Sequence, residues 1–404
     1  MSRFFDYHPD QVYLLPPSVA EVLSESHLCF HVHRVVEALE VSEFEQAYSA
    51  EGRLAYPPRM MLKVWLYAFC LQVTSTRRLE QRIREDLPMR YLAGGLAPDH
   101  KTLSEFLRRH RRAINDVFTQ VLAIARKAGM AQLGHVAIDS TRIRANAARL
   151  SMVDVAQGER DQRAHDRRQV RQFQHKALAS EPNENGGVTL AAEQQQALSS
   201  QLEAARNGLP PLPRQRRPQV STTDPDCRFL RSRKGWVLGY TGDLAVSQDY
   251  FIVAARVTQN ATDNGSLAPL LDEVERGCKA RPEKASADSG FFSQEALHAC
   301  RERNIDVYLP DNNLTHEINT GEQTHDLIGA NTIRDAEHLR MRAKLRTAEG
   351  RSIYRKRQAI VEPLFGILKE QRGGGRFLRR GLEAVNTEWK LLAIAHNLRR
   401  MLRR

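Results

Sequence analysis

The sequence has few cysteines and no long apolar run. Five cysteines occur among 404 residues, and no two of them form a CxxC pair. This odd and scattered set fits a protein that works in a reducing cytosol. No stretch of 18 consecutive apolar residues is present, so hydropathy predicts neither a membrane-spanning helix nor a membrane partner. We therefore expect a cytoplasmic chain.

Positive charge is abundant. Lysine and arginine outnumber the acidic residues by 60 to 48, which gives a net charge of +12 and an isoelectric point near 9.7. This balance favours a polyanionic partner such as nucleic acid, and a basic but otherwise ordinary enzyme is the alternative. The hydrophobic content of 41% is enough for a real core, and the length predicts two or three domains.

The basic charge is concentrated at the C-terminal end. Residues 351–404 carry 14 Lys or Arg and only four acids, one of which, Glu362, precedes Pro363 in a helix-like segment. On a helix, Arg355, Glu362 and Lys369 form one stripe because they are seven residues apart. Glu362 is then either a metal ligand or a partner in an intrahelical salt bridge. Pro363 disfavours the α conformation before it and predicts a kink or a helix start there.

Residues 1–130 are predicted to form a helical DNA-binding domain. Thr102 and Glu105 form a capping box, which places a helix start at Leu103. That helix would carry four arginines in a helix-turn-helix-like setting: Arg108, Arg109, Arg111 and Arg112. A solvated basic face of an ordinary helix bundle is the alternative.

Residues 131–404 show a different periodicity, in which short strands alternate with helices. Strands are expected at 135–139, 235–246, 250–258, before 288 and at 305–310, with helices between the later ones. Gln-, Arg- and Ala-rich helix formers within about 145–234 predict an inserted helical hairpin, with disorder as the alternative. This order matches a mixed α/β (α+β) sheet of the RNase-H-like type.

Three acids occupy positions at which such a sheet presents chemistry. Asp139 ends the run HVAID, Asp288 ends KASAD, and Glu362 lies in the basic C-terminal helix. Side chains at strand ends face a crevice while the core holds the strand. An acid triad suits two Mg²⁺ ions, which prefer oxygen ligands and assist both the attacking and the leaving oxygen of a phosphodiester. Neighbouring Arg and Lys would hold the DNA phosphates.

Other residues near the strands are better explained by structural roles. Four aspartates stand in turn-like sequences, where Asp is common for backbone reasons: Asp224, Asp226, Asp243 and Asp249. The segment HLCFHVH offers a zinc-like set without a second ligand cluster: His27, Cys29, His31 and His33. Trp236 is expected to pack in the core, and stacking on a base is its alternative.

Several segments together resemble DDE-type bacterial insertion-sequence transposases. The catalytic blocks of that family are similar to AIDSTRIRANA, ADSGFFS and the C-terminal block that begins YRKRQAIVEPLFGILKEQRGGG. The segment PDHKTLSEFLRRHR is similar to the N-terminal domain of the superfamily, and STTDPDCRF with VTQNATDNGSLAPLLDEV is similar to its central region. The resemblance covers most of the chain and is weakest in the inserted segment.

The resemblance implies that Asp139, Asp288 and Glu362 bind the catalytic metal, two Mg²⁺ ions or Mn²⁺ in their place. It also implies DNA contacts by a Tyr, Arg and Lys signature and its neighbour: Tyr354, Arg355, Arg357 and Lys369. The sequence departs from the usual spacing, because four residues rather than three separate Arg357 from Glu362. This departure affects the role of Arg357 more than that of Glu362.

The implied activity is that of a transposase. Such a protein binds the terminal inverted repeats of its element, cuts the DNA and joins the freed 3′-OH to target DNA. Its partners would be double-stranded DNA and further copies of the chain, associated with the nucleoid. The alternatives are a catalytically silent DNA-binding derivative and a nuclease that only hydrolyses.

Overall fold

The structure, a computed structural model, describes these parts of the chain: residues 18–48, 54–148, 151–154, 219–232, 235–320, 336–371 and 373–403. The chain forms two compact units. One comprises Met1–Asn146 with Cys227–Arg404, and the other comprises Ala147–Asp226. The helical hairpin expected in the insertion lies outside the described residues, and the predicted boundary near residue 130 stays a prediction.

Short helices make up the N-terminal part of the first unit: α1 (Val19–Val22), α2 (Leu28–Glu37), α3 (Ser42–Glu45), α4 (Pro58–Cys70), α5 (Thr76–Glu85), α6 (Leu87–Leu92), α7 (His100–Arg109) and α8 (Arg111–Lys127). Helix α4 is apolar on nearly every side, so it is buried and packs against α2, α6 and α16 (Leu382–Leu402). Its Trp65 is fully buried.

The predicted start of the basic helix is wrong. Asp99 caps α7, because its Oδ1 accepts the N–H of Thr102 at 2.7 Å, and the helix begins at His100 rather than at Leu103. His110 then separates α7 from α8. The four arginines expected on one helix are therefore divided between two.

The core of the first unit is a mixed sheet, which confirms the RNase-H-like fold class. Its strands are β1 (His135–Arg144), β4 (Arg228–Ser232), β5 (Gly235–Ser247), β6 (Ile252–Thr258), β7 (Lys284–Ser286) and β8 (Asp306–Tyr308). They run in the order β4-β5-β1-β7-β8, and β6 also pairs with β5. Strands β1, β7 and β8 are parallel, whereas β4, β5 and β6 pair antiparallel. Strand β4 falls within the stretch assigned to the insertion, yet it belongs to this sheet.

Strand β1 continues beyond Asp139, where the sequence predicted its end. Residues 136–144 of β1 pair with β5 over its residues 239–247. The hydrogen bonds to β5 satisfy the backbone N–H and C=O groups of the polar segment STRIR, so the strand continues beyond the end of the apolar run. Asp139 thus lies in the middle of β1.

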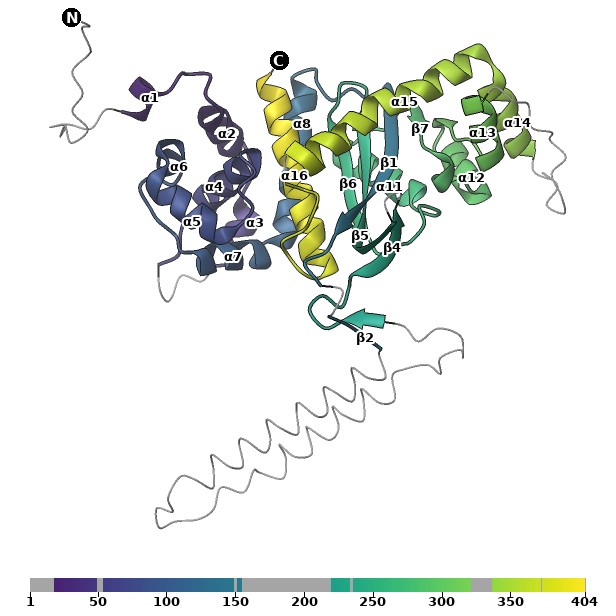
Figure 1. Ribbon diagram of the computed structural model, residues 1–404. Coiled ribbons are helices and arrows are strands. Elements are labelled where there is room, and N and C mark those ends of the chain that lie inside the picture. The colour runs from purple at the N-terminus through teal and green to yellow at the C-terminus, as the bar shows by residue number, and fades with distance from the viewer. Residues whose placement is uncertain are drawn as a thin grey trace, which may run out of the picture. The chain divides into compact units, whose positions relative to one another are not determined.

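Helices pack around the sheet: α11 (Leu267–Cys278), the 3₁₀ turn η2 (Ser289–Phe291), α12 (Gln294–Glu302), α13 (Asn312–Thr320), α14 (Ala336–Arg346), α15 (Ala348–Gly366), the π turn η3 (Ile367–Gln371) and α16. Figure 1 shows α15 running across the sheet, where it contacts β1, β5, β7 and β8. Pro363 lies inside α15, so neither a helix start nor an end occurs at Glu362. The irregular π turn follows four residues later.

Helix α16 joins the two parts of the first unit. It packs against β6 on one side and against α4 and α8 on the other. Trp389 is fully buried, and its Nε1 donates to the Asp243 carbonyl at 3.3 Å. The expected burial of Trp236 is wrong, since this side chain is 60% exposed at the start of β5.

The second unit contains a small antiparallel pair of strands, β2 (Met152–Asp154) and β3 (Gln219–Ser221). The Ser151 hydroxyl lies 2.8 Å from the Ser221 hydroxyl beside this pair. Across the described residues, no helix is both long and apolar enough to cross a membrane.

Candidate active site

Asp139 lies on β1, and Asp288 lies two residues beyond the end of the neighbouring strand β7. Strands β1 and β7 are parallel, and the last residues in register are Ala137 and Ser286. Each aspartate lies two residues beyond that pair. Side chains two residues apart on an extended chain point to the same face of the sheet. Both aspartates therefore point to the face to which Ala137 and Ser286 point. The fold thus brings together two acids that are far apart in the sequence.

Asp139 is a half-buried carboxylate that accepts two hydrogen bonds. Its Oδ2 accepts from Arg357 Nη1 at 3.0 Å, and its Oδ1 accepts the N–H of Ser140 at 2.8 Å. Burial raises the pKa of Asp139 to about 6; the positive charge of Arg357 opposes this rise, and the charge of Asp288 adds to it. The two aspartates are therefore close enough to repel each other.

Asp288 begins the turn that follows β7. Its Oδ1 accepts the N–H of Gly290 at 3.1 Å and caps the 3₁₀ turn η2. Burial raises the pKa of Asp288; Arg357 opposes this, and Asp263 adds to it. Asp288 thus shares one cation with Asp139 and faces another carboxylate.

Arg357 and Tyr354 are the residues of α15 that face these acids. Both are buried, and the guanidinium carbon of Arg357 lies 5.6 Å from the centre of the Tyr354 ring. The family resemblance assigned both to DNA contacts, but in the structure Arg357 contacts a carboxylate. An arginine that is 7% exposed and paired with an acid that is 16% exposed neutralises charge inside the site.

Glu362 lies elsewhere on α15. Its side chain is exposed, whereas Val361 before it is fully buried. Successive helical residues differ by about 100° in direction, so Glu362 cannot share the direction of Val361. Over the described parts of the chain, no three His, Cys, Asp or Glu side chains gather as a metal site. The structure brings Asp139 and Asp288 together without Glu362, whose role as third ligand stays a prediction.

Asp263 is a neighbouring carboxylate that sequence reasoning missed. A Cβ placed on Gly290 would lie 3.1 Å from Asp263 Oδ2 and 3.2 Å from Asp288 Oδ1. A side chain at this position would therefore require both carboxylates to shift by a few tenths of an ångström. Asp263 forms an ion pair with Arg142 Nη1 at 3.1 Å. The segment NATDNGS around Asp263 is typical of a turn and gave no signal of a site.

Lys369 and Arg355, two of the predicted DNA contacts, differ in position. Lys369 is half-buried in the π turn, and its Nζ donates to the carbonyl of Arg142 in β1 at 3.1 Å. Arg355 is exposed on α15. The expected stripe with Glu362 is interrupted, because the helix changes to a π turn before Lys369.

Among the competing aspartates, Asp243 has the most perturbed surroundings. It is fully buried on β5. Burial raises its pKa to about 7; Asp263 raises it further, and Arg256 and Arg142 lower it. In the antiparallel register Asp243 lies opposite Ser140, the neighbour of Asp139, and so it points to the other face of the sheet.

The N-terminal arginines have separate partners. Arg108 donates to both carboxylate oxygens of Glu105, at 2.7 and 2.6 Å, and Arg111 pairs with Glu383 at 3.0 Å. Arg109 lies over the Tyr48 ring at 5.2 Å. Arg112 is exposed on α8. Their DNA-binding role stays a prediction.

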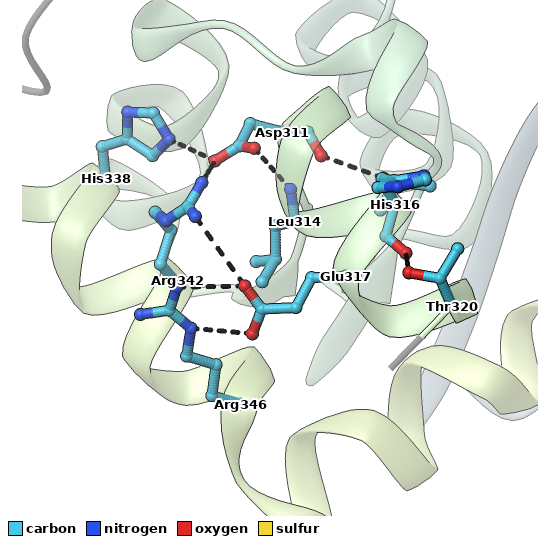
Figure 2. A network of polar contacts seen from close by, with 9 residues as sticks. Asp311, Leu314, His316, Glu317, Thr320, His338, Arg342 and Arg346 are labelled. Atoms are coloured by element: carbon cyan, nitrogen blue, oxygen red, sulfur yellow. Dashed lines mark hydrogen bonds and ion pairs between the residues drawn. The ribbon is translucent and has the colours of Figure 1, made fainter. Parts of the chain in front are cut away.

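A buried ion network supports the site from α13 and α14 (Figure 2). Asp311 Oδ2 accepts from His338 Nε2 at 2.7 Å and from Arg342 Nη1 at 2.6 Å. Glu317 accepts two hydrogen bonds from Arg346, each at 3.0 Å. Burial raises the pKa of Asp311, but hydrogen bonds from the Leu314 N–H, His338 and Arg342 outweigh it, and the net shift is downward.

This network reaches the turn that holds Asp288. The His338 ring lies 4.6 Å from the ring of Phe292, centre to centre, and Phe292 directly follows η2. Helix α13 contacts η2, and α14 packs on α15. Charged residues of this kind gave no sequence signal, because a buried arginine such as Arg342 is indistinguishable in sequence from a solvated one.

Comparison with protein families identifies the chain. Residues 17–109 match a family model described as a transposase domain (DUF772), and residues 321–402 match one described as a transposase DDE domain. The chain therefore carries a transposase domain in its N-terminal part and a transposase DDE domain in its C-terminal part. No curated protein and no solved structure matches it. The DDE match includes Arg357 and Glu362, whereas Asp139 and Asp288 lie outside both matched ranges.

Proposed function

We propose that this transposase binds double-stranded DNA at the terminal inverted repeats of its element, cuts it, and transfers the freed 3′-OH to target DNA as an assembly of several copies. The observation that carries the proposal is the pair of half-buried aspartates, Asp139 and Asp288, on one face of an RNase-H-like sheet. The matched DDE domain and the net charge of +12 support a DNA substrate.

The two aspartates fit a divalent cation. Their oxygens are the hard ligands that Mg²⁺ prefers, and their mutual repulsion favours a cation between them. Asp139 and Asp288 would hold Mg²⁺, with Glu362 as the predicted third ligand. Once bound, Mg²⁺ stabilises negative charge on phosphate oxygens and promotes the ionised form of an attacking water.

The protein's own residues prepare this site. Arg357 fixes the Asp139 carboxylate and reduces the repulsion between the two aspartates. The N–H of Gly290 donates to Asp288 Oδ1 and orients this carboxylate. Lys369, held on the Arg142 carbonyl, places a cation near β1 for a DNA phosphate.

Cleavage of a labelled duplex that carries the element end tests the proposal. We expect Asp139→Asn and Asp288→Asn to lose cleavage to background while end binding persists, because phosphate contacts supply most of the affinity. Asp116→Asn, which alters an exposed acid of α8, is the matched control and should cut normally. Cleavage at the wild-type rate by either site variant would contradict the assignment.

The exposure of Glu362 favours one second candidate, a catalytically silent DNA-binding derivative. Glu362→Gln separates the two. Loss of cleavage in this variant supports a triad that assembles on DNA, whereas an inactive wild-type chain that still binds ends supports the silent derivative. A strand-transfer assay with pre-cut ends separates a transposase from a nuclease that stops after hydrolysis.

A further inference from the structure

A large cleft opens at the end of the sheet opposite to Asp288. Its volume is about 920 Å³, and it lies where β1 and β7 begin, lined by His135 and Lys284 of those strands. The turn between β5 and β6 contributes Tyr250, and α15 contributes Lys356. Because Asp288 follows the other end of β7, this cleft is separate from the carboxylate site.

A second cavity adjoins Tyr250, which also lines the large cleft. This cavity measures about 310 Å³. Its lining includes three arginines at the end of α16: Arg399, Arg400 and Arg403. We call the two cavities together the basic cleft, since the acid among their lining residues is Glu283 alone.

One face of α15 and η3 forms a wall of the basic cleft. The residues that line it recur at helical spacing: Ile353, Lys356, Ile360, Leu364 and Ile367. At about 1.5 Å per residue, this wall is roughly 20 Å long. Tyr354 and Arg357 turn toward the aspartates instead. Helix α15 therefore stands between the acidic site and the basic cleft.

Several cations of the basic cleft lack an acidic partner. Among the described residues, three of these cations form no ion pair: Lys284, Lys356 and Arg403. Lys356 and Arg403 are exposed, and Lys284 is half-buried. Arg281 differs, because it pairs with Glu275 at 2.9 Å. Exposed lysines and arginines without a carboxylate are the groups that exchange counterions for phosphates.

The junction of the two cavities is held in an unusual conformation. Tyr250 has a positive φ of 66°, which is costly for a residue with a large side chain. The Arg400 guanidinium lies 5.2 Å from the centre of its ring, and Arg400 Nε donates to the Asp249 carbonyl at 3.1 Å. His396 Nε2 lies 2.9 Å from the Tyr250 carbonyl. The fold thus fixes an arginine where the two cavities meet.

We propose that the basic cleft binds the phosphate backbone of a second DNA duplex, separate from the duplex held at Asp139 and Asp288. A wall of roughly 20 Å spans several phosphates, which follow each other every 3.4 Å along one strand. The proposal rests on the proposed function for the choice of DNA as the polyanion. It goes further by assigning a second DNA site to a face without carboxylate chemistry.

The salt dependence of binding tests this proposal on the full chain. The probe is a fluorescent duplex of unrelated sequence, and the variant is Lys284→Gln/Lys356→Gln. We expect the slope of log K against log salt to become less steep by about 1.8, the effect of two lost phosphate contacts. Arg276→Gln/Arg351→Gln removes two exposed cations outside the cleft and should leave the slope unchanged. An equal change in both variants, or no change in the cleft variant, would overturn the proposal.

Further measurements keep this test independent of the proposed function. Thermal melting establishes that the cleft variant is folded, and Arg403→Gln, at the far end of the cleft, should reduce the slope by about 0.9. An unchanged slope for Arg403→Gln would refute the extension into the smaller cavity. Cleavage of end DNA by the cleft variant should equal wild type, while strand transfer to a second duplex falls. If the wild-type chain cuts no ends, the proposed function fails, but the slopes still decide whether the cleft binds DNA.

Discussion

Two groups of charged residues in this molecule differ in how they are held. Arg357 and Asp139 are 7% and 16% exposed, and α15 fixes them against the sheet. Arg108 and Glu105 form a shorter pair on α7, at 2.6 Å against 3.0 Å, but they are 68% and 41% exposed. Water screens the second pair, whereas the first pair has no such screening. The same kind of ion pair is therefore fixed by the fold at one place and contributes little at the other.

The largest expected effect is the loss of stability when the ion pair between Arg357 and Asp139 is broken. Arg357→Met keeps the length of the side chain but leaves Asp139 and Asp288 without their cation. We expect the free energy of unfolding to fall by about 3 to 5 kcal/mol, because the remaining buried charge is uncompensated. Urea unfolding measures this loss. Arg108→Met is the matched control on the exposed pair and should cost less than about 1 kcal/mol.

A second substitution checks the cause of that loss. In Arg357→Met/Asp139→Asn the unpaired charge is gone, so part of the stability should return. If the double variant is no more stable than Arg357→Met, packing around α15 rather than charge accounts for the effect.

The next prediction concerns Asp243, a buried acid whose negative charge is less well compensated by neighbouring arginines. Its pKa of about 7 lies above the ordinary value of 3.8, so the folded state holds a proton that the unfolded state has lost. The stability from this group is therefore present below about pH 4 and is lost as the pH rises to about 7. Asp243→Asn should gain stability relative to wild type over this window, by roughly 4 kcal/mol. Unfolding at several pH values measures the difference, and a pH-independent difference would contradict it.

A smaller effect is expected at Gly290. A methyl group there meets carboxylate oxygens of Asp263 and Asp288 at 3.1 and 3.2 Å, so both must move by a few tenths of an ångström. We expect Gly290→Ala to slow end cleavage by about tenfold, since small displacements of a catalytic group are costly. Gly277→Ala is the control, because a Cβ there would make ordinary contacts, the nearest at 3.8 Å. Equal cleavage by both variants would remove Asp263 and Gly290 from the site.

Much of the fold follows from local pattern. A helix was expected between the strand at 250–258 and the strand before 288, and α11 lies there. Its apolar residues recur at helical spacing, and a residue in the left-handed conformation, Lys279, follows it. Strand β6 is likewise an apolar run between turns. The length of β1 was not predictable, since only its pairing with β5 makes STRIR a strand.

The candidate site was predictable only in part. Asp139 and Asp288 can be proposed from their strands, and the parallel register then explains their proximity. The position of Glu362 depends on how far α15 continues through Pro363, which opposing local preferences left undecided. Asp263 stands in a loop and became visible only through its distance to Gly290. Long-range contacts of this kind leave no periodic trace in a sequence.

The smallest expected effect concerns DNA binding by the exposed arginines of α7 and α8. Arg112 forms no ion pair among the described residues, whereas Arg108 is held by two hydrogen bonds to Glu105. If this face contacts DNA, Arg112→Gln should make the salt slope of end binding less steep by about 0.9. Arg108→Gln should change it less, because the Arg108 guanidinium already binds both carboxylate oxygens of Glu105 and is less available to a phosphate. Both variants should keep their stability to within about 0.5 kcal/mol, as surface substitutions usually do. Equal slopes for wild type and both variants would place the DNA-binding face away from α7 and α8, and would leave the exposed arginines as solvated charges.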